Sequence, residues 1–162
     1  MVWASPLSIS ASGLTAGRLR LDVIAENIAN ADTTRATFEG GRWQPYVRRT
    51  VALEPIPLRP ANFAAELQAA LGSPARPSPV GTGMLAGGVR VRAIERDPSP
   101  PKRVYDPGHP DADEGGFVAY PNVEFTREMV DLLAAARAYE ANATAFAVGK
   151  ALWQKTLELG RR

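Results

Sequence analysis

The chain has 162 residues and a mass of 17.4 kDa, enough for one domain of ordinary size. Hydrophobic residues make up 45% and charged residues 22%, which excludes a wholly disordered chain. There is no cysteine, which excludes a disulfide scaffold, a thiolate metal site and a cysteine nucleophile. Most of the 14 glycines and 14 prolines lie in the middle of the chain, and this predicts terminal helices around an irregular, strand-containing middle.

The charge is more informative in its distribution than in its total. A net charge of +2 with a pI near 9.2 is too weak to indicate nucleic-acid binding. Residues 33–105 carry eleven basic side chains against five acidic ones, whereas residues 106–131 carry seven acidic side chains against one basic. Two interpretations stay open: solvated faces of opposite sign, or complementary patches suited to head-to-tail contact between identical or related subunits.

The N-terminal residues do not have the pattern of a secretory signal peptide. The first basic residue is Arg18, and serines and a proline interrupt the apolar residues before it. No stretch reaches the ~20 apolar residues of a membrane-spanning helix. We therefore expect no cleavable signal and no direct membrane insertion.

The apolar residues near the N-terminus recur with helical period and predict a helix from about Leu7 to Ala29. The helix should end near residues 30–33, with Asn27 and Asn30 hydrogen-bonded to backbone at the turn toward the middle of the chain. One row of this helix has a spacing of seven residues: Leu7, Leu14, Leu21 and Ile28.

A second helix is predicted from Thr126 to Gly160, with Thr126 as its cap and Glu128 and Asp131 near the positive end of the helix dipole. This helix also has a row of side chains with a spacing of seven, formed by Leu132, Tyr139, Phe146 and Trp153. Leu157 flanks that row. A helix of ~50 Å is too long to bury its row on a small domain. We therefore expect the helices to form an antiparallel coiled-coil-like pair, and both rows to serve as subunit interfaces.

The middle of the chain is predicted to be rich in β-strands, at residues 46–53, 89–93, 103–105 and 117–120. A Pro/Gly-rich insert, about 55–88, is expected to hold a short helix at 62–71 and a mobile loop at 72–88. The expected fold class is α+β. Residues 1–34 and 124–162 would form a terminal helical domain, and residues 35–123 a small β-rich middle domain.

Candidate chemistry is weak. The glycine-rich segment 81–87 has the wrong spacing for a nucleotide-binding loop, and a strand follows it. The polar cluster 106–116 holds the only histidine, His109, but its spacing matches no Ca²⁺ loop and one histidine cannot complete a typical zinc set. Its prolines and glycines favour tight turns in which aspartates bond the local backbone.

We therefore expect that the protein is not an enzyme and has no catalytic residue, cofactor, metal or small-molecule substrate. Two alternative functions belong to other classes of protein. One is a cell-wall hydrolase acting through the cluster Asp106–Glu114. The other is a basic helical module that binds nucleic acid, although the weak net charge leads us to expect no nucleic-acid partner.

Two sets of segments resemble a known family. Residues 10–16 and 24–33 resemble the N-terminal motif of bacterial flagellar rod, hook and related axial proteins. Residues 104–113, 116–124, 128–129 and 136–142 resemble the proximal-rod members of that family. The residues that carry the likeness include Asn27, Ile28, Asn30, Asp106, Pro107, His109, Pro110, Pro121, Asn122, Tyr139 and Asn142.

The resemblance implies a structural subunit of the proximal rod in the flagellar basal body. Such subunits polymerise through their terminal helices into a helical tube that crosses the periplasm, transmits torque from motor to hook and surrounds the export channel. The implied partners are copies of itself, other rod subunits and the flagellar type III export apparatus. Another axial subunit of the rod or hook is the nearest alternative.

Two features depart from the family pattern. Glu26 stands where the family commonly has a second Asn, which we interpret as a mild change on an exposed turn, and the stretch 55–88 is longer than expected. Because both apolar rows would face water in a lone chain, we also expect the ends to be partly disordered in the monomer and ordered on assembly.

Overall fold

The computed structural model describes residues 6–57 and 86–161. The elements follow the order α1 (Pro6–Ala29), β1 (Thr37–Glu39), β2 (Arg42–Gln44), β3 (Arg49–Pro57), β4 (Ala86–Arg96), β5 (Lys102–Tyr105), β6 (Phe117–Tyr120) and α3 (Phe125–Gly160). The α+β class is confirmed, with a helix at each end and small antiparallel sheets between them. The predicted helix at 62–71, the segment 81–85 and most of the insert lie outside the described residues.

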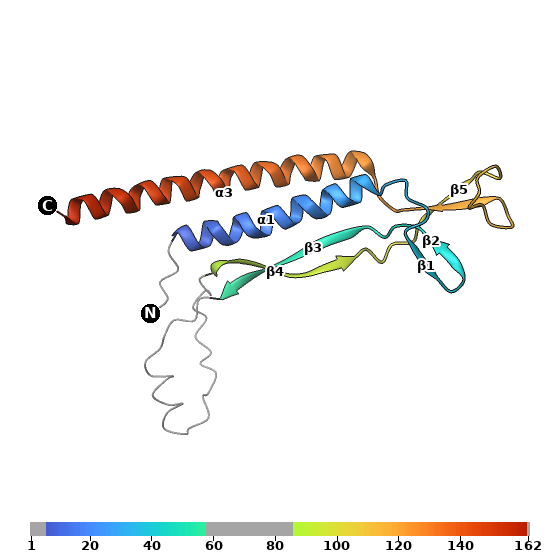
Figure 1. The fold of residues 1–162 in the computed structure, drawn as a ribbon, viewed down its shortest axis with the longest axis horizontal. Helices are drawn as coiled ribbons and strands as arrows, with labels where there is room; N and C mark the ends of the chain where they lie inside the picture. Colours follow the sequence, from blue (N-terminus) through green and yellow to red (C-terminus); the bar gives the residue numbers. More distant parts are fainter. Residues whose placement is uncertain (1–5, 58–85, 162) are drawn as a thin grey trace, which may run out of the picture.

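The two helices lie side by side along the long axis of the molecule and run in opposite directions (Figure 1). α1 also contacts the long ribbon formed by β3 and β4. Among the described residues, three of the buried apolar side chains come from α1 and one from α3 (Ala16, Val23, Ile24 and Ala135), and the others are Tyr46 and Val118. Most of the core is therefore a thin seam along α1.

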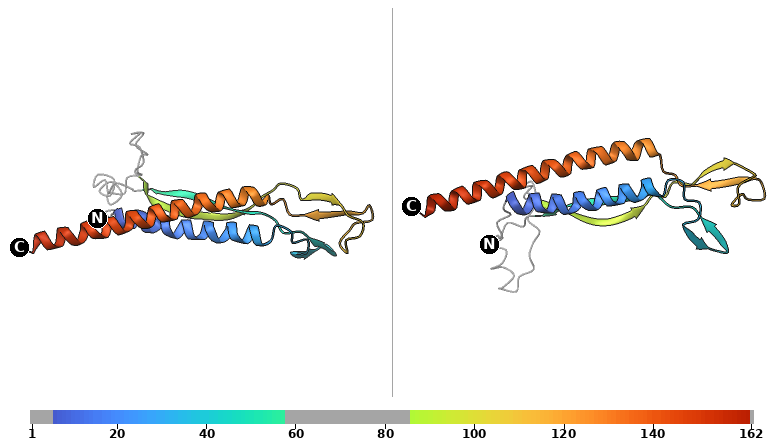
Figure 2. Two further views of the ribbon diagram at one scale, coloured as in Figure 1. Left: turned by 90° about the horizontal axis from the view of Figure 1, so that it is seen from above. Right: turned by 45° about the horizontal axis from the view of Figure 1, so that its top comes forward.

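The helices differ in length, and this leaves the end of α3 beyond its partner. α1 has 24 residues and α3 has 36, or ~54 Å. Both views in Figure 2 show α3 continuing past the start of α1 at one end, with the short hairpins at the other. Among the described helices, none combines the length and apolarity that crossing a membrane requires.

The strands form three two-stranded antiparallel sheets, β1–β2, β3–β4 and β5–β6. The pairing of β3 with β4 is interrupted by register shifts near Leu53 and Pro55. A hydrogen bond connects this ribbon to α1: Ser12 Oγ accepts from the backbone N–H of Val89 (3.1 Å).

Several predicted boundaries need correction. The prediction of loop at residues 86–88 is wrong, because β4 begins at Ala86 and pairs there with Pro57. The first long strand begins at Arg49 rather than residue 46, because Tyr46 and Arg48 turn toward the helices. The hairpin β1–β2 was not expected, although its turn, Gly40-Gly41, has φ of +61° and +80°, the left-handed values that such a two-residue turn requires.

The start of α3 also differs from the prediction. The helix begins at Phe125, and its N-cap is Glu124, which makes no side-chain capping bond. Thr126 therefore lies inside the first turn, and its predicted capping role is wrong. The cause is tertiary, since Glu128 in that first turn is fully buried and anchors the helix start by contacts with distant segments.

Candidate functional site: the helix seam and a buried polar hub

The seam between the helices depends on close approach at three glycines. A methyl group added at Gly13 would lie 2.9 Å from Asn142 Nδ2, and one added at Gly149 would lie 3.1 Å from Leu7 Cδ2. A methyl group at Gly17 would lie 3.4 Å from Tyr139 Cδ2. These facing positions show the register in which the two helices lie.

At the hairpin end, the seam closes on two polar side chains that are each only 1% exposed, Asn27 of α1 and Glu128 of α3. Asn27 Nδ2 donates a hydrogen bond to Glu128 Oε2 (3.1 Å). We call the group formed by Asn27, Tyr46, Arg48, Arg49 and Glu128 the polar hub. It joins both helices to the start of β3.

Asn27 binds the backbone of β3 as a neighbouring strand would. Its Nδ2 donates to the carbonyl of Arg49 (2.8 Å), and its Oδ1 accepts from the Arg49 N–H (2.9 Å) and from Tyr46 Oη (3.0 Å). The residue lies inside α1, which ends at Ala29, whereas Asn30 Nδ2 bonds the carbonyl of Glu26 (2.9 Å) just past the helix end. Asn27 therefore holds the strand to the helix.

Glu128 is held by Arg48, whose Nε donates to Glu128 Oε1 (2.7 Å). The same guanidinium reaches Asp97 at 3.4 Å and Asp131 at 3.9 Å. Burial acts to lower the pKa of Arg48, but the hydrogen bonds and charges of Glu128 and Asp97 outweigh burial, so the pKa lies above its ordinary value. Glu128 lies in the first turn of α3, as predicted, and it is also a buried anchor, which the prediction did not include.

The interpretation of Glu26 also changes. Its carboxylate is half-buried and accepts a hydrogen bond from Arg49 Nη1 at 2.8 Å, so the residue supports the hub instead of standing free on an exposed turn. Sequence reasoning missed Arg48 altogether. A signal existed, since Glu128 precedes Leu132 by one helical turn in the apolar row, and an acid at such a position requires a buried partner.

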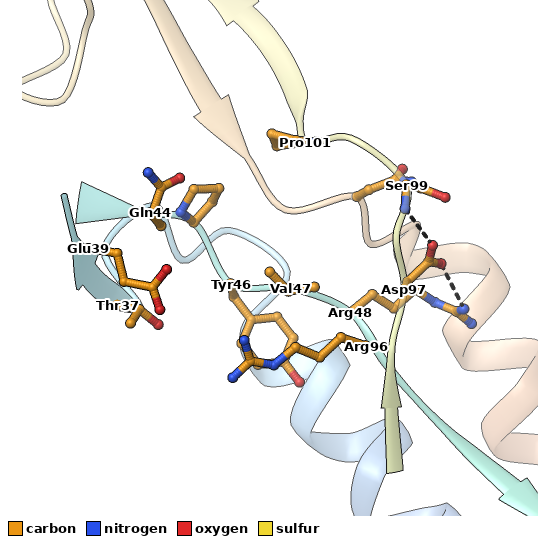
Figure 3. A pocket seen from close by; sticks show the side chains of 12 residues that line it. Thr37, Glu39, Gln44, Tyr46, Val47, Arg48, Arg96, Asp97, Ser99 and Pro101 are labelled. Atoms are coloured by element: carbon orange, nitrogen blue, oxygen red, sulfur yellow. Dashed lines mark hydrogen bonds and ion pairs between the residues drawn. The ribbon is translucent and has the colours of Figure 1, made fainter. Parts of the chain in front are cut away.

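Beside the hub lies a small open pocket of about 190 Å³ (Figure 3). Tyr46 and Arg48 form part of its wall, and Asp97 accepts a hydrogen bond from the backbone N–H of Ser99 at 2.9 Å. Hydrogen bonds from Ser99, followed by the bond and charge of Arg48, lower the pKa of Asp97. Burial raises the pKa of Tyr46. The volume falls below the ~300 Å³ at which small-molecule sites begin.

The cluster at 106–116 is built from turns. Asp106 Oδ1 accepts from the Gly108 N–H (3.2 Å), and Asp113 Oδ1 accepts from the N–H groups of Gly115 and Phe117 (both 2.9 Å). The prediction of aspartates bonding the local backbone is confirmed for these two residues. Within the described parts of the chain, no group of three or more His, Asp or Glu side chains is placed to hold a metal ion.

The third aspartate of this cluster, Asp111, reaches across the chain instead. It forms an ion pair with Arg35 and accepts a hydrogen bond from Thr34 Oγ1 (2.9 Å), while its own N–H donates to His109 Nδ1 (3.1 Å). The hydrogen bond from Arg35 is the main reason that the pKa of Asp111 is lowered.

The oppositely charged halves of the middle of the chain pair with each other. Arg35 pairs with Asp111, and Arg103 pairs with Asp113. Arg48 of the basic segment likewise pairs with Glu128 of the acidic segment. Much of the complementary charge that suggested head-to-tail contact is therefore used within one chain.

The nine predicted interface residues fall into two groups. Seven are half-buried along the helix pair: Leu7, Leu14, Leu21, Ile28, Leu132, Tyr139 and Phe146. Trp153 and Leu157 lie on the extension of α3 and are exposed, Trp153 by 59%. Among the other motif residues, Pro121 is buried and Asn142 half-buried in the seam, whereas Pro107, Pro110 and Asn122 are exposed.

Comparison with known proteins gives matches at both helical ends. Residues 7–37 match the family described as "Flagella basal body rod protein", and residues 114–159 match "Flagellar basal body rod FlgEFG protein C-terminal". The "Flagellar basal-body rod protein FlgC" of Bacillus subtilis is 42% identical over 155 residues, which cover 96% of each chain. The chain belongs to the FlgC family of flagellar basal-body rod proteins.

Other relatives named "Flagellar basal-body rod protein FlgC" are similar over most of their length. That of Borreliella burgdorferi is 40% identical over 96% of this chain and 95% of its own, and that of Salmonella typhimurium is 35% identical over 94% of both. Near-complete coverage of the B. subtilis relative gives no support to the expectation that the stretch 55–88 is unusually long.

Membership of the FlgC family confirms the resemblance and the functional assignment. The chain is a structural subunit of the bacterial flagellar rod and is located in the basal body. The family is one of structural proteins and not of enzymes, and its members assemble with other rod components. The two matched segments contain the two central hub residues, Asn27 and Glu128.

Proposed function

We propose that the FlgC-family subunit polymerises through its terminal helices into the proximal rod, the tube that transmits torque from motor to hook around the export channel. The observation that carries this proposal is the apolar extension of α3. Its residues from 151 to 160 are all exposed, and four of them have large apolar side chains: Leu152, Trp153, Leu157 and Leu159.

The energetics favour covering this extension. Complete burial of a Leu or Phe side chain is worth about 1.5–3 kcal/mol. α1 begins at Pro6, and Leu7 already contacts Gly149, so α1 does not cover the last turns of α3. The neighbouring subunit is the partner that would bury them.

The outward face of α3 supports further contacts. Val130, Leu133 and Val148 are exposed, and alanines between them leave a flat surface that another helix can approach closely. The two helices would act as a coiled-coil-like antiparallel pair within this packing. Leu14, Leu21 and Phe146 are only half-buried in the single chain, which agrees with rows completed by neighbours.

We further propose that residues 1–34 and 124–162 form the tube-building part and residues 35–123 the β-rich middle part. The polar hub would connect the two. Transport through the flagellar type III export apparatus, without a cleavable signal, and contacts with other rod subunits belong to the same proposal. It assigns no catalytic residue, no cofactor and no metal.

The test compares two tryptophans with similar exposure. Trp153→Asp places a charge on the extension of α3, whereas Trp43→Asp makes the same change on the β1–β2 hairpin, where Trp43 is 51% exposed. We expect Trp153→Asp to abolish rod formation in isolated basal bodies and motility on soft agar, and Trp43→Asp to retain rods. Normal rods with Trp153→Asp would contradict the proposal.

A further inference from the structure

The apolar rows of the helices do not by themselves select one register. Both rows repeat every seven residues, so a slip of seven, ~10 Å along the axis, again places apolar residues in the seam. Gly17, which faces Tyr139, would then face Phe146. Because α3 has 36 residues against 24 in α1, such a slip would leave α1 covered along its whole length.

Hydrophobic contact alone does not exclude the slipped register. The facing pairs Leu7/Gly149 and Gly17/Tyr139 identify the observed alignment. A slip of seven in the direction that shortens the extension would bring Trp153 opposite Ser10, where α1 could cover it. The observed register instead leaves Trp153 mostly in solvent. Some contact other than the apolar rows must therefore hold the observed register.

The contact between Asn27 and Glu128 meets this requirement. Both side chains are 1% exposed and hydrogen-bonded to each other, and each is fixed independently: Asn27 by the backbone of Arg49, and Glu128 by Arg48. After the slip, Ala135 would stand opposite Asn27, and both Arg48 and Asn27 would lose their carboxylate partner. Each would lose a hydrogen bond at a buried site, which is unfavourable even though Asp97 still pairs with Arg48 and the Arg49 backbone with Asn27.

We propose that the Asn27–Glu128 pair is the register-determining contact of the helix pair. A buried polar residue has this role in coiled coils whose apolar positions are compatible with several alignments. By fixing the register, the pair fixes how much of α3 extends past α1. The consequence for assembly rests on the proposed function, whereas the register itself does not.

The chain contains no cysteine, so introduced pairs can report the register. Leu7→Cys with Gly149→Cys reports the observed register, and shortening residue 7 removes the Cδ2 atom that lies 3.1 Å from the new Cβ. Leu14→Cys with Gly149→Cys reports the slipped one. Disulfide closure in the purified full-length chain under mild oxidation would be quantified by peptide mass spectrometry.

In the otherwise unchanged chain, we expect the Leu7/Gly149 pair to close at least tenfold more than the Leu14/Gly149 pair. Asn27→Leu with Glu128→Leu should raise closure of the slipped pair at least tenfold. The matched control, Asn122→Leu with Glu140→Leu, makes the same two changes at exposed positions and should leave the ratio unchanged. Equal closure of both pairs in the unchanged chain would overturn the proposal.

A second variant decides the question if the double-leucine chain loses its helices by circular dichroism. Glu128→Leu with Ala135→Glu moves the carboxylate by one heptad and keeps Asn27 and Arg48 as partners. The slip that shortens the extension moves the start of α3 toward β6, so the connection at residues 121–124 is not stretched. The expected result is a switch of closure from Leu7/Gly149 to Leu14/Gly149, and exclusive closure of Leu7/Gly149 would overturn the proposal.

Discussion

The two ends of α3 contrast sharply. At the hairpin end, Glu128 is buried and its carboxylate is bonded to Asn27 and Arg48 of the same chain. At the other end, the large apolar side chains of residues 151–160 are exposed and cannot reach α1. One helix thus has a polar end completed by its own chain and an apolar end that is exposed in the single chain. Under the proposed function, this difference would separate the contacts that fold the subunit from those that assemble it.

The largest effect on folding is expected at the buried end. Glu128→Ala should lower the free energy of unfolding by about 3–5 kcal/mol, because Arg48 and Asn27 lose their buried acceptor. Urea denaturation followed by circular dichroism measures the change. Glu140→Ala, an exposed acid on the same helix, is the control and should change stability by less than about 0.5 kcal/mol. A similar effect of both substitutions would remove the contrast between the ends.

The next effect concerns the joint between α1 and β3. Asn27→Ala should cost about 2–3 kcal/mol, since the backbone groups of Arg49 and the hydroxyl of Tyr46 lose their partners. Asn27→Ala with Asn30→Ala should impair rod assembly more than export, measured as rods per cell against secreted subunit. Normal rod formation by the double variant would count against a structural role for Asn27 and Asn30.

At the apolar end, folding and assembly should separate. Leu157→Asp is expected to change the unfolding free energy of the free chain by less than about 0.5 kcal/mol, because the side chain is exposed, yet to block incorporation into rods. Denaturation of the purified chain and immunoblots of basal bodies provide the two readouts. A large loss of monomer stability would show that the extension is already packed within one subunit.

The smallest effect concerns pH and the turns at 106–117. The pKa of Asp113 is lowered mainly by hydrogen bonds from the backbone of Phe117 and Gly115, and that of Asp111 by Arg35. A lowered pKa stabilises the folded turn above the ordinary value of 3.8, and this stabilisation is lost as the pH falls through the lowered pKa. The protection factors of amides in these turns, which correct for the intrinsic exchange rate, should therefore be constant between pH 5 and 7 and fall once the pH drops below about 4. Asp113→Asn should abolish the dependence at Gly115 and Phe117.

The sequence was sufficient for the features that depend on local pattern. The seven-residue rows predicted both helices nearly to their ends, alternation located β4, and the short strands β5 and β6 lie where they were predicted. The hub could not be obtained in this way, since Arg48 and Glu128 lie eighty residues apart and meet only when three elements pack. Local rules predicted Glu128 in the first turn, which is correct, and Thr126 as the cap, which is wrong, and they could not predict that Glu128 is buried. The hairpin β1–β2 was missed because each strand has only three residues.

Hydrogen–deuterium exchange of the extension tests the central claim most directly. The backbone amides of residues 150–160 would be followed in the free full-length chain and in isolated rods, with the amides around Asn27 and Glu128 as an internal reference. We expect rapid exchange of 150–160 in the free chain, strong protection in the rod, and protection of the reference amides in both. Equal protection of 150–160 in the free chain and the rod would contradict it.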